Sequence, residues 1–343
     1  MTTFVEKSRA TFHRFVMALA ILAIAAATTA ACLRSARPTL APNGALLEES
    51  AFRFPQFEDL PPYLSGTYTR ESWAEILRDD SVACSRLKYS SDGLSVAGFV
   101  YAPADTGAKH PVLIFNRGGN RDMGKIGLDE LLFMRTFAKS GYVVLGSQYR
   151  GSDGGEGRDE FGGRDVDDVL NLLPLARRLG NVDLDNVYMV GHSRGGMMVY
   201  LALKRGMRVS AAVAWGAPTD LEALGRERPV MVRYVYSEII PHFARRPEDA
   251  LRERSAVEWP EALDTPLLLV HGDADKRVPA SQAIELAARL RALGKSCEIV
   301  IYPGGDHMLS KNLDQAIERM KAWFRSHETP TRDEPAPAPQ APS

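Results

Sequence analysis

The chain has 343 residues and a formal net charge of -1, with 45% hydrophobic and 25% charged residues. This length and composition are typical of one large globular α/β domain with appendages, and the small net charge argues against nucleic acid as a partner. The sequence contains no zinc-type cysteine pairs, no phosphate-binding Gly-Lys-Ser/Thr loop and no dinucleotide fingerprint. We therefore expect neither a cofactor nor a metal ion.

Residues 1–37 have the composition of an export signal. Basic residues as far as Arg14 precede an uncharged run over 15–33 that is rich in Ala, Ile and Leu, which is the order of a secretory signal. Residues 29–32 read Thr-Ala-Ala-Cys and resemble a bacterial lipobox, in which Cys32 is the lipidated residue. The run also approaches the roughly 20 residues that span a bilayer. A cleaved signal, a lipoprotein anchor and a transmembrane anchor stay open, and each places the protein outside the cytoplasm, in the periplasm or cell envelope.

Residues 38–84 are expected to wrap the outside of the domain that follows and to narrow its pocket. They are rich in proline and aromatic residues and become helical near 72–77. Cys84 ends this segment, and Cys297 lies far along the chain. Two buried thiols are expected, although an oxidising compartment would permit a disulfide and the pairing stays open.

A regular pattern runs over 85–326. Ser91-Asp92-Gly93 predicts a hairpin between strands at 86–89 and 95–101, after which short apolar strands alternate with longer helical segments. Further strands are expected at 111–115, 187–190, 211–215, 267–270 and 298–302, and helices at 128–139, 166–179, 197–204, 281–293 and 313–325. This alternation predicts a mostly parallel sheet with helices on both faces, which binds ligands at the carboxyl ends of its strands.

Two further segments stand apart from this pattern. An insertion over 219–263 mixes charged residues with aromatic ones and predicts a helical cap over the strand ends. Its aromatic side chains either form the core of the cap or contact substrate, and the first role is the more common one. The tail over 327–343 is rich in proline and alanine and is expected to be disordered.

The segment Gly191-His192-Ser193-Arg194-Gly195 directly follows the apolar strand at 187–190. A serine at such a sharp strand-to-helix turn is raised above the sheet, and flanking glycines are needed because larger side chains would collide there. The pattern indicates that Ser193 is a catalytic nucleophile.

A serine nucleophile needs a histidine base and a carboxylate that orients the histidine. Of the seven histidines, His307 follows the last expected strand, as the base does in the chain order Ser, acid, His. The acid is expected after the preceding strand, where we choose Asp275 over its neighbour Asp273 and the more distant Asp220. A role of Asp275 as a helix cap stays open.

Backbone amides must stabilise the oxyanion of the tetrahedral intermediate. One is expected from Arg194, the residue after the nucleophile, and the second from Gly118 or Gly119, in the loop after the strand at 111–115. Arg117 and Arg121 flank these glycines, and they either bind a substrate carboxylate or belong to a solvated loop.

Taken together, these motifs resemble the catalytic domain of the prolyl oligopeptidase family within the α/β-hydrolase fold. The similar segments are Gly-His-Ser-Arg-Gly-Gly, His-Gly-Asp-Ala-Asp-Lys-Arg-Val-Pro and Gly-Gly-Asp-His, together with Gln148-Tyr149-Arg150-Gly151-Ser152 and the acidic stretch after Glu160. The resemblance covers about residues 85–325 and implies Ser193, Asp275 and His307 as the triad. Tyr149, in the similar loop, is added as a candidate substrate contact. Large family members carry a β-propeller before this domain, for which the residues before 85 leave no room.

The sequence thus predicts an exported serine hydrolase that cleaves peptide, amide or ester bonds through an acyl-enzyme, with a short peptide or small ester as substrate. Two alternatives stay open: a carboxylesterase without peptidase activity, and a non-catalytic binding protein on the same fold. The natural substrate and the oligomeric state do not follow from the sequence.

Overall fold

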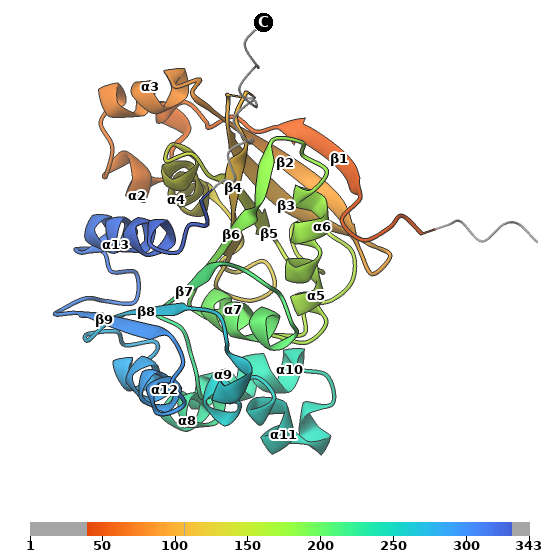
Figure 1. The fold of residues 1–343 in the computed structure, drawn as a ribbon, viewed down its shortest axis with the longest axis vertical. Coiled ribbons are helices and arrows are strands. Elements are labelled where there is room, and N and C mark those ends of the chain that lie inside the picture. The colour runs from red at the N-terminus through yellow and green to blue at the C-terminus, as the bar shows by residue number, and fades with distance from the viewer. Residues whose placement is uncertain (1–39, 106, 331–343) are drawn as a thin grey trace, which may run out of the picture. The chain divides into compact units, whose positions relative to one another are not determined.

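The strands of the described residues form one sheet in the order β1-β2-β3-β5-β4-β6-β7-β8-β9 (Figure 1). The computed structural model describes residues 40–105 and 107–330, so the predicted export signal, Cys32 and most of the Pro-rich tail lie outside the described residues. All elements named below belong to one unit, Pro42–Ser343. Its strands are β1 (Leu46–Ala51), β2 (Val82–Ser91), β3 (Leu94–Pro103), β4 (His110–Asn116), β5 (Val143–Ser147), β6 (Val182–His192), β7 (Ala211–Trp215), β8 (Leu267–Gly272) and β9 (Cys297–Tyr302).

Strands β4 to β9 pair in parallel, whereas β1, β2 and β3 add an antiparallel edge. The central strands are almost continuously apolar, as expected where a parallel sheet is covered on both faces. The fold is the α/β-hydrolase fold, which confirms the prediction from the alternating pattern.

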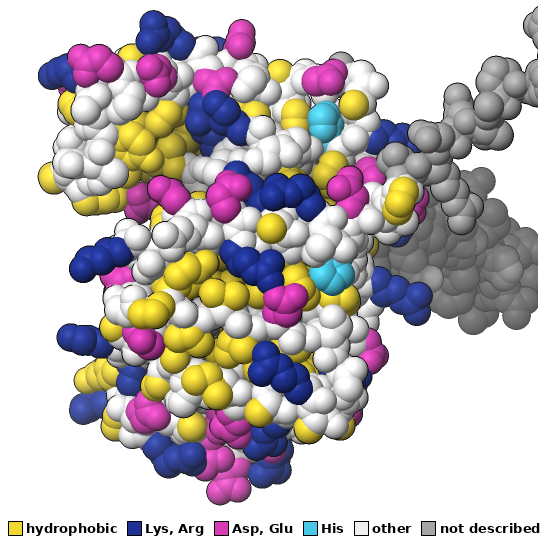
Figure 2. All heavy atoms as spheres, turned by 60° about the vertical axis from the view of Figure 1, so that its left-hand side comes forward, with side chains coloured by type: hydrophobic (Ala, Val, Ile, Leu, Met, Phe, Trp, Pro, Cys, Tyr) yellow, Lys and Arg dark blue, Asp and Glu magenta, His cyan; other side chains and the backbone are white. Residues whose placement is uncertain are grey.

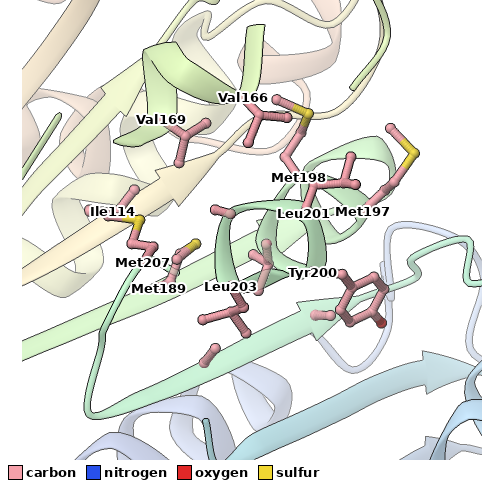
Figure 3. Packing of buried hydrophobic residues seen from close by; sticks show 14 of the residues in the cluster. Ile114, Val166, Val169, Met189, Met197, Met198, Tyr200, Leu201, Leu203 and Met207 are labelled. Atoms are coloured by element: carbon pink, nitrogen blue, oxygen red, sulfur yellow. The ribbon is translucent and has the colours of Figure 1, made fainter. Parts of the chain in front are cut away.

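Helices cover the two faces of the sheet separately. They are α4 (Leu128–Ala138) and α13 (Leu313–Arg325) on one face, and α5 (Asp165–Leu170), α6 (Leu172–Ala176), α7 (Arg194–Lys204) and α12 (Ala280–Ala292) on the other. Alternate residues of β4 show the division, since Ile114 packs in the core with α7 and Leu113 packs in the core with α4. Figure 3 shows the first of these cores, in which side chains of α7 meet Ile114, Met189 and Val166.

Two segments differ from the sequence prediction. The helix expected over 166–179 is divided into α5 and α6, because Pro174 has no N–H to donate to the Leu170 carbonyl. The N-terminal segment does more than wrap the domain: it supplies β1 to the sheet edge, then α2 (Pro62–Ser65) and α3 (Arg70–Arg78). Trp73 of α3 is fully buried among Leu60, Leu64 and residues of α4.

The insertion over 219–263 folds into short helices, as the prediction of a helical cap required. These are α8 (Leu221–Glu227), α9 (Pro229–Met231), a π-helical turn η2 (Val232–Tyr236), α10 (Ser237–Ile239), η3 (Phe243–Arg245), α11 (Pro247–Arg252), η4 (Ala256–Glu258) and η5 (Pro260–Ala262). Tyr236, Phe243 and Trp259 are buried, whereas Tyr234 is half exposed.

Neither cysteine of the described residues is in a disulfide, since Cys84 on β2 and Cys297 on β9 lie toward opposite edges of the sheet. Within residues 40–105 and 107–330, no helix combines the length and apolar character needed to cross a membrane.

Candidate active site

Ser193 sits at the turn between β6 and α7 with φ 55° and ψ -125°, a backbone conformation that is strained for any residue but glycine. The neighbouring glycines leave no room for a side chain. A Cβ on Gly195 would lie 1.9 Å from the Asn116 carbonyl oxygen, and a Cβ on Gly191 would lie 2.1 Å from the Gly195 carbonyl oxygen. The turn therefore has the geometry of a nucleophile elbow, with Ser193 partly exposed above the sheet.

Asp275 and His307, which the sequence paired by chain order, are hydrogen-bonded. The Nδ1 atom of His307 lies 2.7 Å from Oδ2 of Asp275, and both residues are buried. Because Nδ1 faces a carboxylate, it carries the proton, and Nε2 is left as the basic nitrogen. The other oxygen of Asp275 accepts the amides of Arg277 and Val278, so the carboxylate also ends its own turn, as the capping alternative suggested.

Burial raises the pKa of Asp275, but hydrogen bonds from His271, His307 and the Val278 amide outweigh burial and hold that pKa well below its usual range. Asp275 is therefore ionised at neutral pH. Asp273 instead accepts the Gly304 amide, and Asp220 caps α8 by accepting the Ala223 amide, so neither competitor faces His307.

Two further histidines support this pair, and sequence reasoning did not assign them a role. The Nε2 atom of His271 lies 2.8 Å from the Val278 carbonyl oxygen and 3.3 Å from Asp275 Oδ2, so its single N–H holds both. His192 donates from Nε2 to the His307 carbonyl at 3.0 Å, and its ring packs between His307 and Trp215. Burial lowers the pKa of His192 to about 3 and keeps its ring neutral. The position of His192 directly before Ser193 was the one sequence feature that could have indicated its role in the site.

The nucleophile and the base lie in the same cluster. The Ser193 amide donates to the Trp215 carbonyl at 2.8 Å, and the next residue, Gly216, approaches the imidazole so closely that a Cβ there would lie 3.4 Å from Nδ1 of His307. Within the described residues, the Ser193 hydroxyl makes no hydrogen bond to His307. Catalytic hydrogen bonds of this kind are often long without substrate and tighten in the substrate complex.

Arg194 and Gly118 both lie against Ser193. As the first residue of α7, Arg194 has no acceptor within the helix for its backbone N–H. A Cβ on Gly118 would lie 3.3 Å from Cβ of Ser193, a tight contact that favours glycine where this loop passes the nucleophile. Gly119 turns the loop away with φ 65°. The two predicted sources of an oxyanion hole therefore flank the nucleophile.

Arg117 and Tyr149 do not reach substrate, contrary to the expectation from the sequence. Both are fully buried: Arg117 donates to the Gly118, Arg121 and Gln148 carbonyls, and the Tyr149 hydroxyl donates to the Arg117 carbonyl at 3.1 Å. In a trans peptide the N–H points opposite to the C=O. By holding the carbonyls of residues 117 and 118, these side chains thus fix the direction of the Gly118 and Gly119 amides.

The Arg194 side chain also contacts the loop after β4, which holds Gly118 and Gly119. It forms a two-pronged ion pair with Asp159, at 2.7 and 2.8 Å, a second ion pair with Asp165, and a hydrogen bond to the Gly119 carbonyl at 3.0 Å. All three charged groups are buried. Arg121, the other candidate for binding a substrate carboxylate, forms an exposed ion pair at 2.7 Å with Glu238 of the cap.

A cavity of about 330 Å³ opens beside Ser193 between the loop after β4 and the cap. Its walls are mostly apolar, and residues of the cap contribute to them. It is lined by Gly119, Asn120, Met123, Phe161, Ser193, Arg194, Pro218, Leu224, Arg228, Met231, Tyr236, Arg277 and Val278. An apolar cavity with a few polar groups is the usual form of a small-ligand site.

A larger cavity, of about 470 Å³, lies among α2, α4 and α13 and includes His192 and Trp215, but Ser193 does not line it. Figure 2 shows the side of the molecule that carries these helices, where hydrophobic side chains gather between charged ones. Because Ser193 lines the smaller cavity, we assign that cavity to the part of the substrate that reacts with the serine.

Comparison with known proteins identifies the family of the chain. The model of the prolyl oligopeptidase family matches residues 132–329. An uncharacterized peptidase of Bacillus subtilis (strain 168), YtmA, is 28% identical over 240 residues, which cover 69% of this chain and 91% of the relative. Dipeptidyl-peptidase 5 of Porphyromonas gingivalis is 28% identical over 255 residues, 70% of this chain but 37% of that protein.

Two solved structures share the fold. The acylaminoacyl peptidase of Pyrococcus horikoshii superposes on this chain with a TM-score of 0.62 at 21% identity. The superposed part covers 74% of this chain and 42% of the peptidase chain. The cell wall degrading esterase LipA of Xanthomonas oryzae superposes with a TM-score of 0.62 at 15% identity. The superposed part covers 84% of this chain and 100% of the LipA chain. The chain thus spans less than half of the long peptidases, in the part that holds the hydrolase domain. It belongs to the prolyl oligopeptidase family and is a serine hydrolase.

Proposed function

We propose that the protein is an exported hydrolase that cleaves peptide, amide or ester bonds with Ser193 as nucleophile, His307 as general base and Asp275 as the orienting acid. The observation that carries this proposal is the 2.7 Å contact between Asp275 and His307 Nδ1, beside a serine in strained elbow geometry. A carboxylate at Nδ1 holds the ring in the tautomer whose opposite nitrogen, Nε2, can accept the proton of the serine.

The reaction would proceed in two halves. Ser193 Oγ bonds to the substrate carbonyl carbon while its proton passes to His307 Nε2, and the carbonyl electrons move onto the oxygen, which the Arg194 and Gly118 amides stabilise. Collapse of this intermediate breaks the bond to the leaving group, which takes the proton from His307. Water then attacks the acyl-enzyme by the same steps and restores Ser193.

The class of scissile bond is open on chemical grounds, because peptide and ester cleavage use the same machinery. The related proteins include peptidases and an esterase. The basic and then apolar N-terminal residues support export, with Cys32 as the proposed lipidation site. Fractionation of cells that produce the wild type and Cys32→Ser tests this point: loss of membrane attachment in the variant supports a lipid anchor, and a cytoplasmic wild type contradicts export.

The catalytic assignment is tested with a fluorophosphonate probe on the full chain. We expect covalent labelling that disappears in Ser193→Ala and is strongly reduced in His307→Ala. A panel of p-nitrophenyl esters and of aminoacyl and dipeptidyl anilides then separates the bond classes. Ester turnover without anilide turnover would refute the peptidase activity. If the wild type is neither labelled by the probe nor able to turn over any substrate, the result would favour a non-catalytic binding protein on this fold.

A further inference from the structure

The cavity beside Ser193 contains a buried hydroxyl without a protein partner. Tyr236 is fully buried, lines this cavity, and its hydroxyl makes no hydrogen bond within the described residues. Its ring packs against Phe161 at 5.7 Å and Phe243 at 6.3 Å, which fixes its position. Buried polar groups in proteins are nearly always hydrogen-bonded. The hydroxyl of this lining residue therefore lacks a hydrogen-bond partner, which a polar group of a bound substrate would supply.

Two arginines that line the same cavity, Arg228 and Arg277, form no ion pair within the described residues. Arg228, at the end of α8, is half buried, lines the cavity, and donates from Nη1 to the Arg277 carbonyl at 2.9 Å. Neither Arg228 nor Arg277, which also lines the cavity, forms an ion pair with any described residue. Nearby arginines are neutralised instead, since Arg194 binds Asp159 and Asp165, Arg121 binds Glu238, and Arg226 binds Glu222.

We propose that this cavity selects substrates whose acyl group carries a carboxylate, with Arg228 as its counter-ion and Tyr236 as a hydrogen-bond donor to it. The inference rests on the proposed function, because it places the acyl side of the scissile bond in the cavity that Ser193 lines. The substrate class is then acidic: esters or amides of a glutamate-like residue or of a dicarboxylic acid.

The walls of the cavity fit such a group. Phe161, Leu224 and Met231 supply apolar surface for the methylene groups between the scissile carbonyl and the carboxylate. A guanidinium only donates hydrogen bonds, and it binds carboxylates in a favourable planar geometry. In a cavity partly shielded from water this attraction is stronger than in solution, and the same charge repels an ammonium group. Arg228 and Tyr236 are specificity-determining residues here and take no part in bond cleavage.

The experiment compares four N-acetyl amino acid thiobenzyl esters, those of Glu, Gln, Leu and Lys, which a peptidase and an esterase can both cleave. We expect kcat/KM to be at least tenfold higher for Glu than for the isosteric Gln, and lowest for Lys. A site that holds a substrate group by paired polar contacts discriminates strongly against analogues that lack the group.

Variants separate the two contacts. Arg228→Gln should bring the Glu-to-Gln ratio close to one, because the charge contact is lost; the variant also loses the hydrogen bond from the guanidinium to the Arg277 carbonyl. Arg228→Glu should favour Lys over Glu. Tyr236→Phe should lower Glu and Gln cleavage alike, since the hydroxyl can donate to either oxygen. Arg226→Gln is the matched control, because Arg226 lies on the same helix, pairs with Glu222 and does not line the cavity.

Each outcome bears on one proposal or on both. Leu ester cleavage without a preference for Glu, or a Glu preference that survives Arg228→Gln, overturns the acidic specificity and leaves the hydrolase intact. Cleavage of none of the esters, together with no fluorophosphonate labelling of Ser193, overturns both. A wild-type circular dichroism spectrum shows that each variant is folded, and Arg228→Lys should retain most of the Glu preference.

Discussion

Arg194 contributes to the site in two ways that depend on different parts of the residue. Its backbone amide lies next to the nucleophile, and its side chain holds Asp159, Asp165 and the Gly119 carbonyl. A buried arginine between two carboxylates can hardly be replaced, because its loss leaves both negative charges buried and close to each other.

We therefore predict that Arg194→Met, which keeps an apolar stem of similar length, lowers the free energy of unfolding by about 3–5 kcal/mol. Urea denaturation followed by circular dichroism measures this loss. Arg164→Met is the control, because Arg164 pairs with Glu160 but has a side chain that is 74% exposed, and such pairs contribute little. Equal effects of the two substitutions would contradict the structural role of Arg194.

Tyr149 offers a test of how the loop after β4 is held. Tyr149→Phe removes only the hydroxyl that donates to the Arg117 carbonyl, so the fold should persist while the Gly118 amide loses its fixed direction. Loss of a direct oxyanion donor costs on the order of 10²-fold in kcat, and we expect loss of a supporting contact to cost about tenfold. KM should stay nearly constant.

Stopped-flow acylation with a p-nitrophenyl ester measures the effect of Tyr149→Phe. The matched control is Tyr188→Phe, whose hydroxyl donates to Asn186 near the amino end of β6, away from the strand ends that carry the site. An unchanged acylation rate in Tyr149→Phe would show that the loop holds its shape without this contact.

At this scale the sequence predicted the residues that chain order and motif spacing define. Ser193, Asp275 and His307 follow strands whose carboxyl ends meet at one edge, and the structure brings Asp275 and His307 into contact. The sequence could not show that Arg117 and Tyr149 are buried, because an arginine beside a glycine loop looks the same whether it points to solvent or inward. The cluster of His192 with His307 and Trp215 likewise depends on a tertiary contact between β6, β7 and the last loop.

Among the elements, α7 was predicted to begin at Met197 but begins at Arg194. Gly195 and Gly196 are poor helix formers, which shortened the prediction. Tertiary contacts override this preference, since a Cβ on Gly196 would lie 2.3 Å from Cβ of Ala217. Strand β1 was not predicted, because six residues with no buried side chain lack the alternation of a half-buried strand.

The N-terminal segment is held to the domain mainly through Trp73. Its indole N–H donates to the Pro55 carbonyl at 3.0 Å, and its ring meets Phe54 and Tyr68 edge to face. Asp79 adds ion pairs to Arg135 of α4 and to Lys139, the residue that directly follows this helix. This small core is separate from the two cores that flank the sheet.

We accordingly predict that Trp73→Ala destabilises this segment by about 3–5 kcal/mol, the usual effect of removing a large buried aromatic side chain. Limited proteolysis should cut the variant first within residues 52–80 and spare the hydrolase domain, because Trp73 belongs to the small cluster with Leu60 and Leu64 and not to either core that flanks the sheet. Tyr63→Ala is the control, since Tyr63 lies on α2 but is 57% exposed. Simultaneous cleavage throughout the domain would show instead that the segment and the sheet unfold as one unit.

At the scale of the whole molecule, several buried ion pairs lie near the carboxyl ends of the strands. Arg150 binds Asp168 from within the core, and Arg194 binds Asp159 and Asp165 beneath the site. The pair of Arg194 with Asp159 stabilises the folded state only while Asp159 is ionised, because the pKa of that carboxyl is lowered in the fold. Asp168 behaves differently, since burial raises its pKa to about 6 despite the hydrogen bonds from Arg150. The loss of stability in acid should therefore depend on Asp159.

Asp159 shows the direction of this effect. Burial raises its pKa, but the Arg194 guanidinium and the hydrogen bonds it accepts lower that pKa further, to about 2. The unfolded chain titrates near the usual value of about 3.9. The stabilisation is thus complete above about pH 4 and is lost as the pH falls toward 2. A difference of nearly two pH units between the folded and unfolded pKa corresponds to about 2.6 kcal/mol.

We predict that Asp159→Asn is less stable than the wild type at pH 7, because Arg194 loses a charged partner, but that its unfolding free energy falls less steeply between pH 4 and pH 2. Urea titrations at a series of pH values measure both slopes. Glu49→Gln on β1 removes an exposed carboxylate and should keep the wild-type slope. If Asp159→Asn and the wild type lose stability in parallel through this range, the acid sensitivity of the domain arises from other carboxylates, and the ion pair beneath the nucleophile contributes little to the stability of the fold.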